Sequence, residues 1–77
     1  MEEFSVLVEG LETDGKGYFI NFKGIAVSEN NARVITLKKA QEMGLTNVTI
    51  DEIERGGVVT SKDEGVLKVS GKSYYTI

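Results

Sequence analysis

Length, composition and charge point to a small globular protein that lacks the usual catalytic and metal-binding side chains. The 77 residues include no Cys and no His, which excludes disulfides, catalytic triads built on those residues, and metal sites that need thiolate or imidazole, so no cofactor or metal is expected. The net charge of −3, with both signs mixed along the chain, argues against a basic patch that holds nucleic-acid phosphates.

The N-terminal third predicts a β-hairpin. Residues 4–9 alternate in character, with Phe4, Val6 and Val8 forming the set that faces inward. Residues 10–17 hold three glycines and an Asp-Gly pair, which is typical of a hairpin loop. Residues 18–23 predict the second strand. The glycine at position 24, followed by residues 25–27, indicates either a bulge or a break into a third short strand.

A helix of about three turns is predicted next. Residues 28–31 offer several N-terminal caps, and Gly44 followed by Leu45 is typical of a left-handed C-terminal cap whose next residue folds back. Val34 projects away from the predicted inward side, which is a hint of a partner on the outer side. The side expected to face the sheet carries Ala32, Thr36, Leu37, Ala40 and Met43.

The C-terminal half predicts further strands. Residues 47–55 fit a strand, a strand with a bulge, or a strand leading into one helical turn, and we favour a strand. After the glycine pair 56–57, three β-type runs at 58–61, 66–69 and 73–77 are separated by turns at 62–65 and 70–72, which predicts a meander.

Together these elements predict an α+β fold for a single domain over residues 1–77. We expect a mainly antiparallel sheet of about five or six short strands with one helix packed on one face, in the order β-β-(β)-α-β-β-β. One helix cannot cover both faces of such a sheet, so the sheet either curls into a partial barrel or meets another molecule with its open face.

The predicted core is small, which favours association. A chain of this size buries only about 60% of the surface that its unfolded form exposes, and such a core supplies about 3–5 kcal/mol. We therefore expect a partner, either another protein or a second copy in a homo-oligomer such as a homodimer. A cytoplasmic location without membrane contact is expected, because no apolar run reaches the roughly 20 residues that span a bilayer and the chain starts Met1-Glu2-Glu3.

The densest acidic cluster is formed by Asp51, Glu52 and Glu54. It could hold a hard cation or provide a general acid and base, but regular alternation would point Asp51 away from the two glutamates. We favour a solvated edge strand that is protected by charge over a carboxylate-dependent enzyme.

Residues 16–22, Lys-Gly-Tyr-Phe-Ile-Asn-Phe, resemble the aromatic strand of an RNA-recognition motif with one residue missing. This resemblance implies single-stranded nucleic-acid binding through Lys16, Tyr18, Phe19, Phe22 and Lys23, which is the alternative function. The missing residue places Tyr18 and Phe22 on one face and Phe19 on the other. We therefore expect either Phe19 or the pair to belong to the core.

The leading hypothesis is a non-enzymatic protein-binding domain, such as a small inhibitor, an antitoxin or a phage-type accessory protein that blocks a partner protein. The order of a hairpin with Asp14-Gly15-Lys16-Gly17-Tyr18, a short strand and a helix is similar to the N-terminal half of HicB-type antitoxins, and that similarity implies a partner-blocking role. Tyrosine is enriched at binding hot spots. The candidate contact residues are Tyr74, Tyr75, Val34, Asp51, Glu52 and Glu54.

Overall fold

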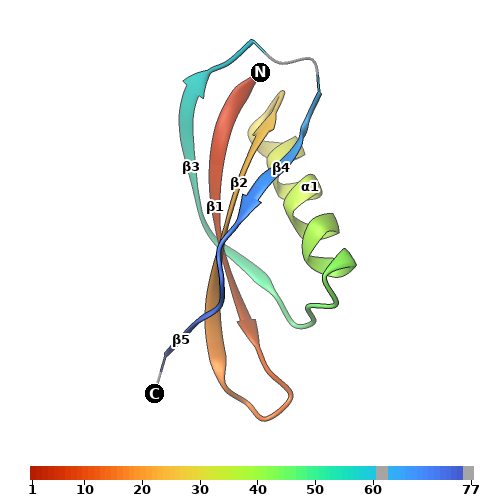
Figure 1. The fold of residues 1–77 in the computed structure, drawn as a ribbon, viewed down its shortest axis with the longest axis vertical. Helices are drawn as coiled ribbons and strands as arrows, with labels where there is room; N and C mark the ends of the chain where they lie inside the picture. The colour runs from red at the N-terminus through yellow and green to blue at the C-terminus, as the bar shows by residue number, and fades with distance from the viewer. Residues whose placement is uncertain (61–62, 76–77) are drawn as a thin grey trace.

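The computed structural model describes residues 1–60 and 63–75, which form one helix packed against a five-stranded antiparallel sheet (Figure 1). This confirms the predicted fold class and element order. The elements are β1 (Glu2–Leu11), β2 (Gly17–Ala26), α1 (Glu29–Glu42), β3 (Thr49–Val58), β4 (Gly65–Val69) and β5 (Ser73–Tyr75).

The β1–β2 hairpin is the centre of the fold. The two strands pair without a register shift, from Glu2 opposite Ala26 to Leu11 opposite Gly17. Because opposed residues of an antiparallel pair share a face, the alternation of both strands puts one apolar set under the helix. This set is buried and consists of Phe4, Val6, Val8, Tyr18, Ile20 and Phe22. The second strand runs without a break to Ala26, so residues 25–27 form no separate strand.

Helix α1 begins and ends where the sequence predicts. The Ser28 side chain accepts a hydrogen bond of 3.1 Å from the Asn31 amide, which caps the N-terminus. At the C-terminus Gly44 adopts a φ of 79°, which glycine tolerates because it lacks a Cβ. The amides of Gly44 and Leu45 then donate to the carbonyls of Gln41 and Ala40, at 3.0 Å each, in the pairing of a Schellman motif.

The side of α1 that faces the sheet is narrower than predicted. Ala32, Thr36 and Ala40, spaced four residues apart, are buried. Leu37 and Met43, expected on the same side, are 41% and 42% exposed. Small residues let the helix backbone approach the sheet closely, so side chains to either side of this single row remain in contact with solvent.

Strand β3 lies at the edge of the sheet next to β1, in the strand order β3-β1-β2-β4. Of the alternatives for residues 47–55, the strand with a bulge is confirmed, because the register shifts between Leu7 and Val8 and leaves Asp51 unmatched. The predicted interruption at the glycine pair 56–57 is wrong. β3 continues to Val58, and a second register shift absorbs the extra residue. The separate strand expected at 58–61 therefore does not start at Val58, and its residue 61 lies outside the described residues.

The predicted C-terminal meander is wrong. β3, β4 and β5 are not neighbours in sequence order: β3 pairs with β1, whereas β4 and β5 both pair with β2. The reason is length, because β2 offers a ten-residue edge and β4 covers only its C-terminal half. Ser70, between β4 and β5, continues the hydrogen bonding to β2. Its hydroxyl accepts from the Asn21 amide and its amide donates to the Asn21 carbonyl, both at 2.9 Å. The expected end of the last strand, residues 76–77, lies outside the described residues.

The helix covers one face of this sheet, and the opposite face has no helix of the described chain over it (Figure 1). We call this opposite side the open face. The pairing register places on it Glu3, Ser5, Leu7 and Glu9 of β1, Phe19, Asn21, Lys23 and Ile25 of β2, Glu52 and Glu54 of β3, and Lys68 of β4.

Candidate functional site

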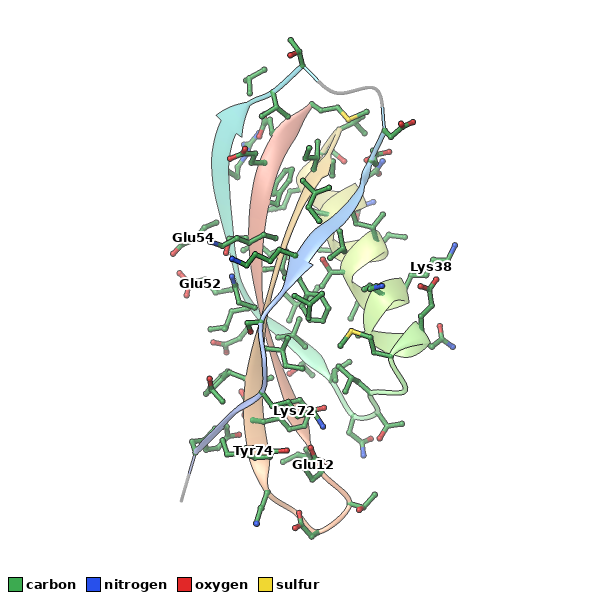
Figure 2. The ribbon with its side chains drawn as sticks, in the orientation of Figure 1. Glu12, Lys38, Glu52, Glu54, Lys72 and Tyr74 are labelled. Atoms are coloured by element: carbon green, nitrogen blue, oxygen red, sulfur yellow. The ribbon has the colours of Figure 1, made fainter. Side chains whose placement is uncertain are left out.

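The open face is acidic along one side. Glu52 lies opposite Leu7 and Glu54 lies opposite Ser5, and both glutamates are exposed on the edge strand β3. Figure 2 shows these two side chains projecting away from the molecule on the side opposite to Lys38 of the helix. The predicted edge strand carrying charge is thus present, and its two glutamates share one face.

Asp51 lies at the bulge of β3, next in sequence to this acidic side. Strict alternation would separate it from Glu52 and Glu54, but the bulge interrupts the alternation at this residue. The hydrogen bond to Glu9 raises the pKa of the Tyr75 hydroxyl, and burial and the negative charges of Glu9 and Asp51 raise it further. The bulge thus removes the regular alternation on which the expected division of the cluster between two faces depended.

Basic residues lie on the other side of the same face. Lys23 and Lys68 are cross-strand partners in the β2–β4 pair, and both are exposed. They oppose four carboxylates on β1 and β3, namely Glu3, Glu9, Glu52 and Glu54. The open face is therefore acidic overall, and its charge is divided between its two sides.

Two shallow hollows lie between these charged sides. One has a volume of about 370 Å³ and is lined by Ser5, Lys23, Gly24, Glu54 and Leu67, among others. The other, of about 200 Å³, is bounded by Ser5, Leu7, Asn21, Glu52 and Glu54. The Ser5 hydroxyl donates to the Asn21 side-chain oxygen at 3.0 Å between the strands. Leu67 is 71% exposed, so an apolar side chain is available beside the first hollow.

At the hairpin end, the open face carries a pair of aromatic rings. The centroids of Phe19 and Tyr75 lie 5.0 Å apart with the rings inclined at 38°. The Tyr75 hydroxyl donates to Glu9 Oε1 at 2.5 Å. Tyr18 and Phe22 point to the helix side and are buried, as expected for the pair that belongs to the core. These two rings are therefore unable to stack on nucleic-acid bases, which needs accessible faces.

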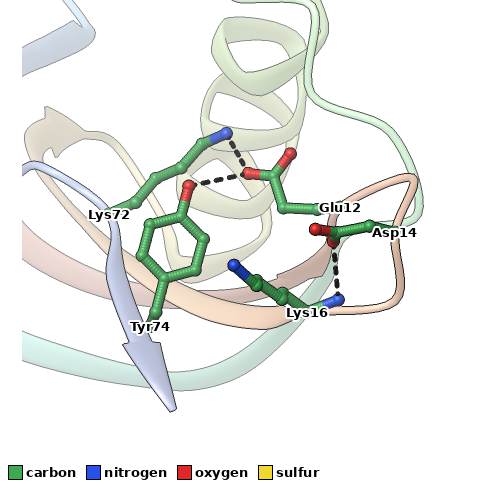
Figure 3. Close-up of polar contacts among 5 residues, drawn as sticks. All are labelled: Glu12, Asp14, Lys16, Lys72 and Tyr74. Carbon is green, nitrogen blue, oxygen red and sulfur yellow. Dashed lines mark hydrogen bonds and ion pairs between the residues drawn. The ribbon is translucent and has the colours of Figure 1, made fainter. Parts of the chain in front are cut away.

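Tyr74 lies on the helix side of the sheet, in a polar cluster that closes the hairpin end (Figure 3). Its hydroxyl donates to Glu12 Oε1 at 3.0 Å, and the Lys72 ammonium forms an ion pair with the same oxygen. Hydrogen bonds from Lys72 and then Tyr74 hold the pKa of Glu12 below its ordinary value, and the same contacts raise the pKa values of Lys72 and Tyr74. At neutral pH the carboxylate thus accepts from two protonated donors. Lys16, at the hairpin loop, is exposed and lies near this cluster.

The structure brings together only part of the predicted contact set. Glu52, Glu54 and Tyr75 belong to the open face and Asp51 lies at the bulge of β3, whereas Tyr74 lies on the opposite face and Val34 lies on the outer side of the helix. Sequence reasoning missed Leu7 and Lys68 as members of this surface. Leu7 could have been predicted, because it lies between Val6 and Val8, whose side chains form the core. Alternation along the strand therefore places the Leu7 side chain on the opposite face. Lys68 could not, because its position depends on the pairing of β4 with β2.

Metal-binding geometry, membrane-spanning helices and similarity to known proteins give no further information about the function of this surface. Among residues 1–60 and 63–75, no three acidic side chains are arranged to hold a metal ion. The single helix described is too short and too polar to cross a membrane. Comparisons with family models, curated proteins and solved structures found no match to this chain.

Proposed function

We propose that this chain is a non-enzymatic protein-binding domain that places the open face of its sheet against a basic surface of another protein. Blocking that surface would make it a small inhibitor, an antitoxin or a phage-type accessory protein. The observation that carries the proposal is the acidic side of the open face, where Glu52 and Glu54 project from an edge strand next to the apolar side chains of Leu7 and Leu67.

The chemistry of the surface supports a protein partner. Interfaces combine apolar contact with a charged rim, and complementary charge steers association. The open face offers an apolar ring pair at one end and Leu67 at the other, with carboxylates along one side. A nucleic-acid partner is disfavoured, because four carboxylates on this face would repel phosphates. Self-association through this face is disfavoured too, since the face is acidic overall and would meet an equally acidic copy.

The test is charge reversal on the open face. The wild-type chain should retain basic proteins from a lysate of the source organism, and the double variant Glu52→Lys/Glu54→Lys should not retain them. The affinity of the double variant for one such protein, once purified, should be lower than that of the wild type by about a hundredfold or more. The reason is that like charges brought together at an interface cost several kcal/mol, of the order that corresponds to this factor. Isothermal titration calorimetry on the retained protein gives the affinity.

The matched control is Glu29→Lys/Glu42→Lys, which makes the same change in net charge at exposed positions of the helix. This control should retain the same proteins as the wild type. Equal loss of the retained proteins from both double variants would mean that net charge alone controls binding. Retention by the open-face variant at wild-type affinity would remove the open face as the binding surface.

A further inference from the structure

The C-terminal strand β5 is attached to the hairpin without entering the core. Its residues Ser73 and Tyr74 are exposed, Tyr74 at 56%, and Tyr75 is half-buried. The buried core comes from β1, β2 and α1, and the half-buried side chains packed against it come from α1, the loop after it, β3 and β4. Detaching β5 would therefore uncover mainly the Tyr18 ring, against which Tyr74 packs with the ring centroids 6.1 Å apart, and leave the other core side chains covered. Elements with few buried apolar contacts are the ones that open locally while the rest of a protein stays folded.

Polar contacts on both faces hold β5 in place. Within the described residues it pairs with residues 17–19 of β2 through Ser73, Tyr74 and Tyr75. On the helix side the Tyr74 hydroxyl bonds to Glu12, and on the open face the Tyr75 hydroxyl bonds to Glu9. Lys72, just before the strand, forms an ion pair with Glu12 and lies 4.6 Å from the centre of the Tyr18 ring. The contacts to Glu12 are solvent-accessible, whereas the hydrogen bond from Tyr75 to Glu9 is partly buried. Exposed polar contacts contribute modestly to stability.

The strand also covers part of the open face. The Tyr75 ring lies over Gly17, where its nearest atoms would be 2.2 Å from a Cβ at that position, and it packs against Phe19. The Tyr75 hydroxyl also donates a hydrogen bond to the Glu9 carboxylate. Opening β5 would uncover the Phe19 ring, free the Glu9 carboxylate and expose the backbone edge of residues 17–19. The first two changes enlarge the apolar and acidic surface assigned to binding, and the third adds an unpaired strand edge beside it.

We propose that β5 is a strap that opens over the hairpin end of the open face while the remainder of the fold stays intact, and that its opening enlarges the binding surface. The strap motion follows from the attachment of β5 alone, whereas its role in binding rests on the proposed function. The strap is joined to β4 through residues 70–72, and Ser70 remains fixed to the Asn21 backbone by two hydrogen bonds, one through its hydroxyl and one through its amide. The hinge is therefore placed at Gly71 and Lys72.

Native-state hydrogen exchange measured by NMR tests the motion. Amides bonded across the β2–β5 pairing should exchange roughly ten- to a hundredfold faster than amides at the centre of the β1–β2 pairing, because they open locally rather than by global unfolding. Tyr75→Phe, which removes the hydroxyl bonded to Glu9, should speed this exchange roughly two- to tenfold and leave the central amides unchanged. Equal protection of both sets of amides in the wild type would overturn the strap.

A disulfide staple supplies the closed reference state. Phe19 and Ser73 are cross-strand partners, and cross-strand Cα distances of about 4.5–5.5 Å suit a disulfide. Because the chain has no cysteine, Phe19→Cys/Ser73→Cys forms one defined bond. Oxidation should slow exchange across the β2–β5 pairing to the rate of the central amides, and reduction should restore it. An unchanged rate after oxidation would contradict local opening of β5.

The same stapled variant separates the motion from its role. Both forms lack the Phe19 ring, so the comparison reports on the Glu9 carboxylate and the backbone edge of residues 17–19, which the closed strap still withholds. The oxidised form should bind the partner identified by the charge-reversal experiment at least about threefold more weakly than the reduced form. Equal affinity of the two forms would overturn the regulatory role. Failure of Glu52→Lys/Glu54→Lys to alter binding would instead count against the proposed function, while the exchange rates would still report on the strap.

Discussion

Replacing Phe22 by alanine is expected to leave the chain largely unfolded at room temperature. Phe22 is 1% exposed at the centre of β2, where it lies opposite Val6 on one side and Val69 on the other. Truncating a buried phenylalanine costs about 3–5 kcal/mol, which is as much as the whole stability of about 3–5 kcal/mol expected from a core of this size. No disulfide is available to compensate, because the chain has no cysteine.

Far-ultraviolet circular dichroism with urea denaturation measures this effect, and Leu67→Ala is its control. Leu67 is 71% exposed on β4, so its truncation should change the free energy of unfolding by no more than about 0.5 kcal/mol. A cooperative unfolding transition of Phe22→Ala with a midpoint near that of the wild type would show that the core does not depend on this ring.

Substituting Gly24 by alanine is the second change expected to have a large effect. A Cβ at this position would lie 2.5 Å from the Gly65 carbonyl oxygen, which belongs to the backbone of β4 and cannot rotate away. Relieving the clash requires β4 to shift from the edge of β2. Overpacking of this kind costs about 1–3 kcal/mol, a large part of the total stability of this chain.

The matched control is Gly57→Ala, because a Cβ at Gly57 would have no heavy atom within 4 Å. Its free energy of unfolding should stay within about 0.5 kcal/mol of the wild type or rise slightly, since alanine lowers the entropy of the unfolded chain. Thermal melts of the two variants provide the comparison. Equal stability of Gly24→Ala and Gly57→Ala would mean that β4 adapts to the added methyl group without loss.

Local signals in the sequence predicted the elements well, because the interactions that form them are local. The Ser28 cap, the left-handed Gly44 and the folded-back Leu45 act within one helical turn, so their residue types are informative on their own. The same holds for the hairpin, where the alternation that starts at Phe4 defines the core face and residues 10–17 contain the turn.

The order of the strands could not be predicted, because it depends on contacts between distant segments. Short consecutive strands separated by turn residues are typical of a meander, yet β4 and β5 share the outer edge of β2 and β3 lies beyond β1. Nothing local to Ser70 indicates that it bonds to the backbone of Asn21, 49 positions earlier in the sequence. Pairing of this kind is decided by the length of the free edge.

The candidate site was predicted only in part, because its remaining features also depend on contacts between distant segments. The charges of Glu52 and Glu54 on an edge strand follow from alternation, but the bulge at Asp51 depends on the register with β1. Tyr75 was predicted as a contact residue from its type alone. The structure instead uses its hydroxyl within the chain, on Glu9, and this contact is what makes β5 a strap.

Site-specific photo-crosslinking in cells of the source organism tests most directly whether the open face binds a partner. A photoreactive phenylalanine analogue replaces Leu67 on the open face in one variant and Val34 on the outer side of the helix in the other, two positions that are 71% and 58% exposed. We expect a discrete covalent adduct with a basic protein from position 67 and none from position 34. An adduct from position 34 alone, or no adduct from either, would contradict the assignment of the open face as the binding surface.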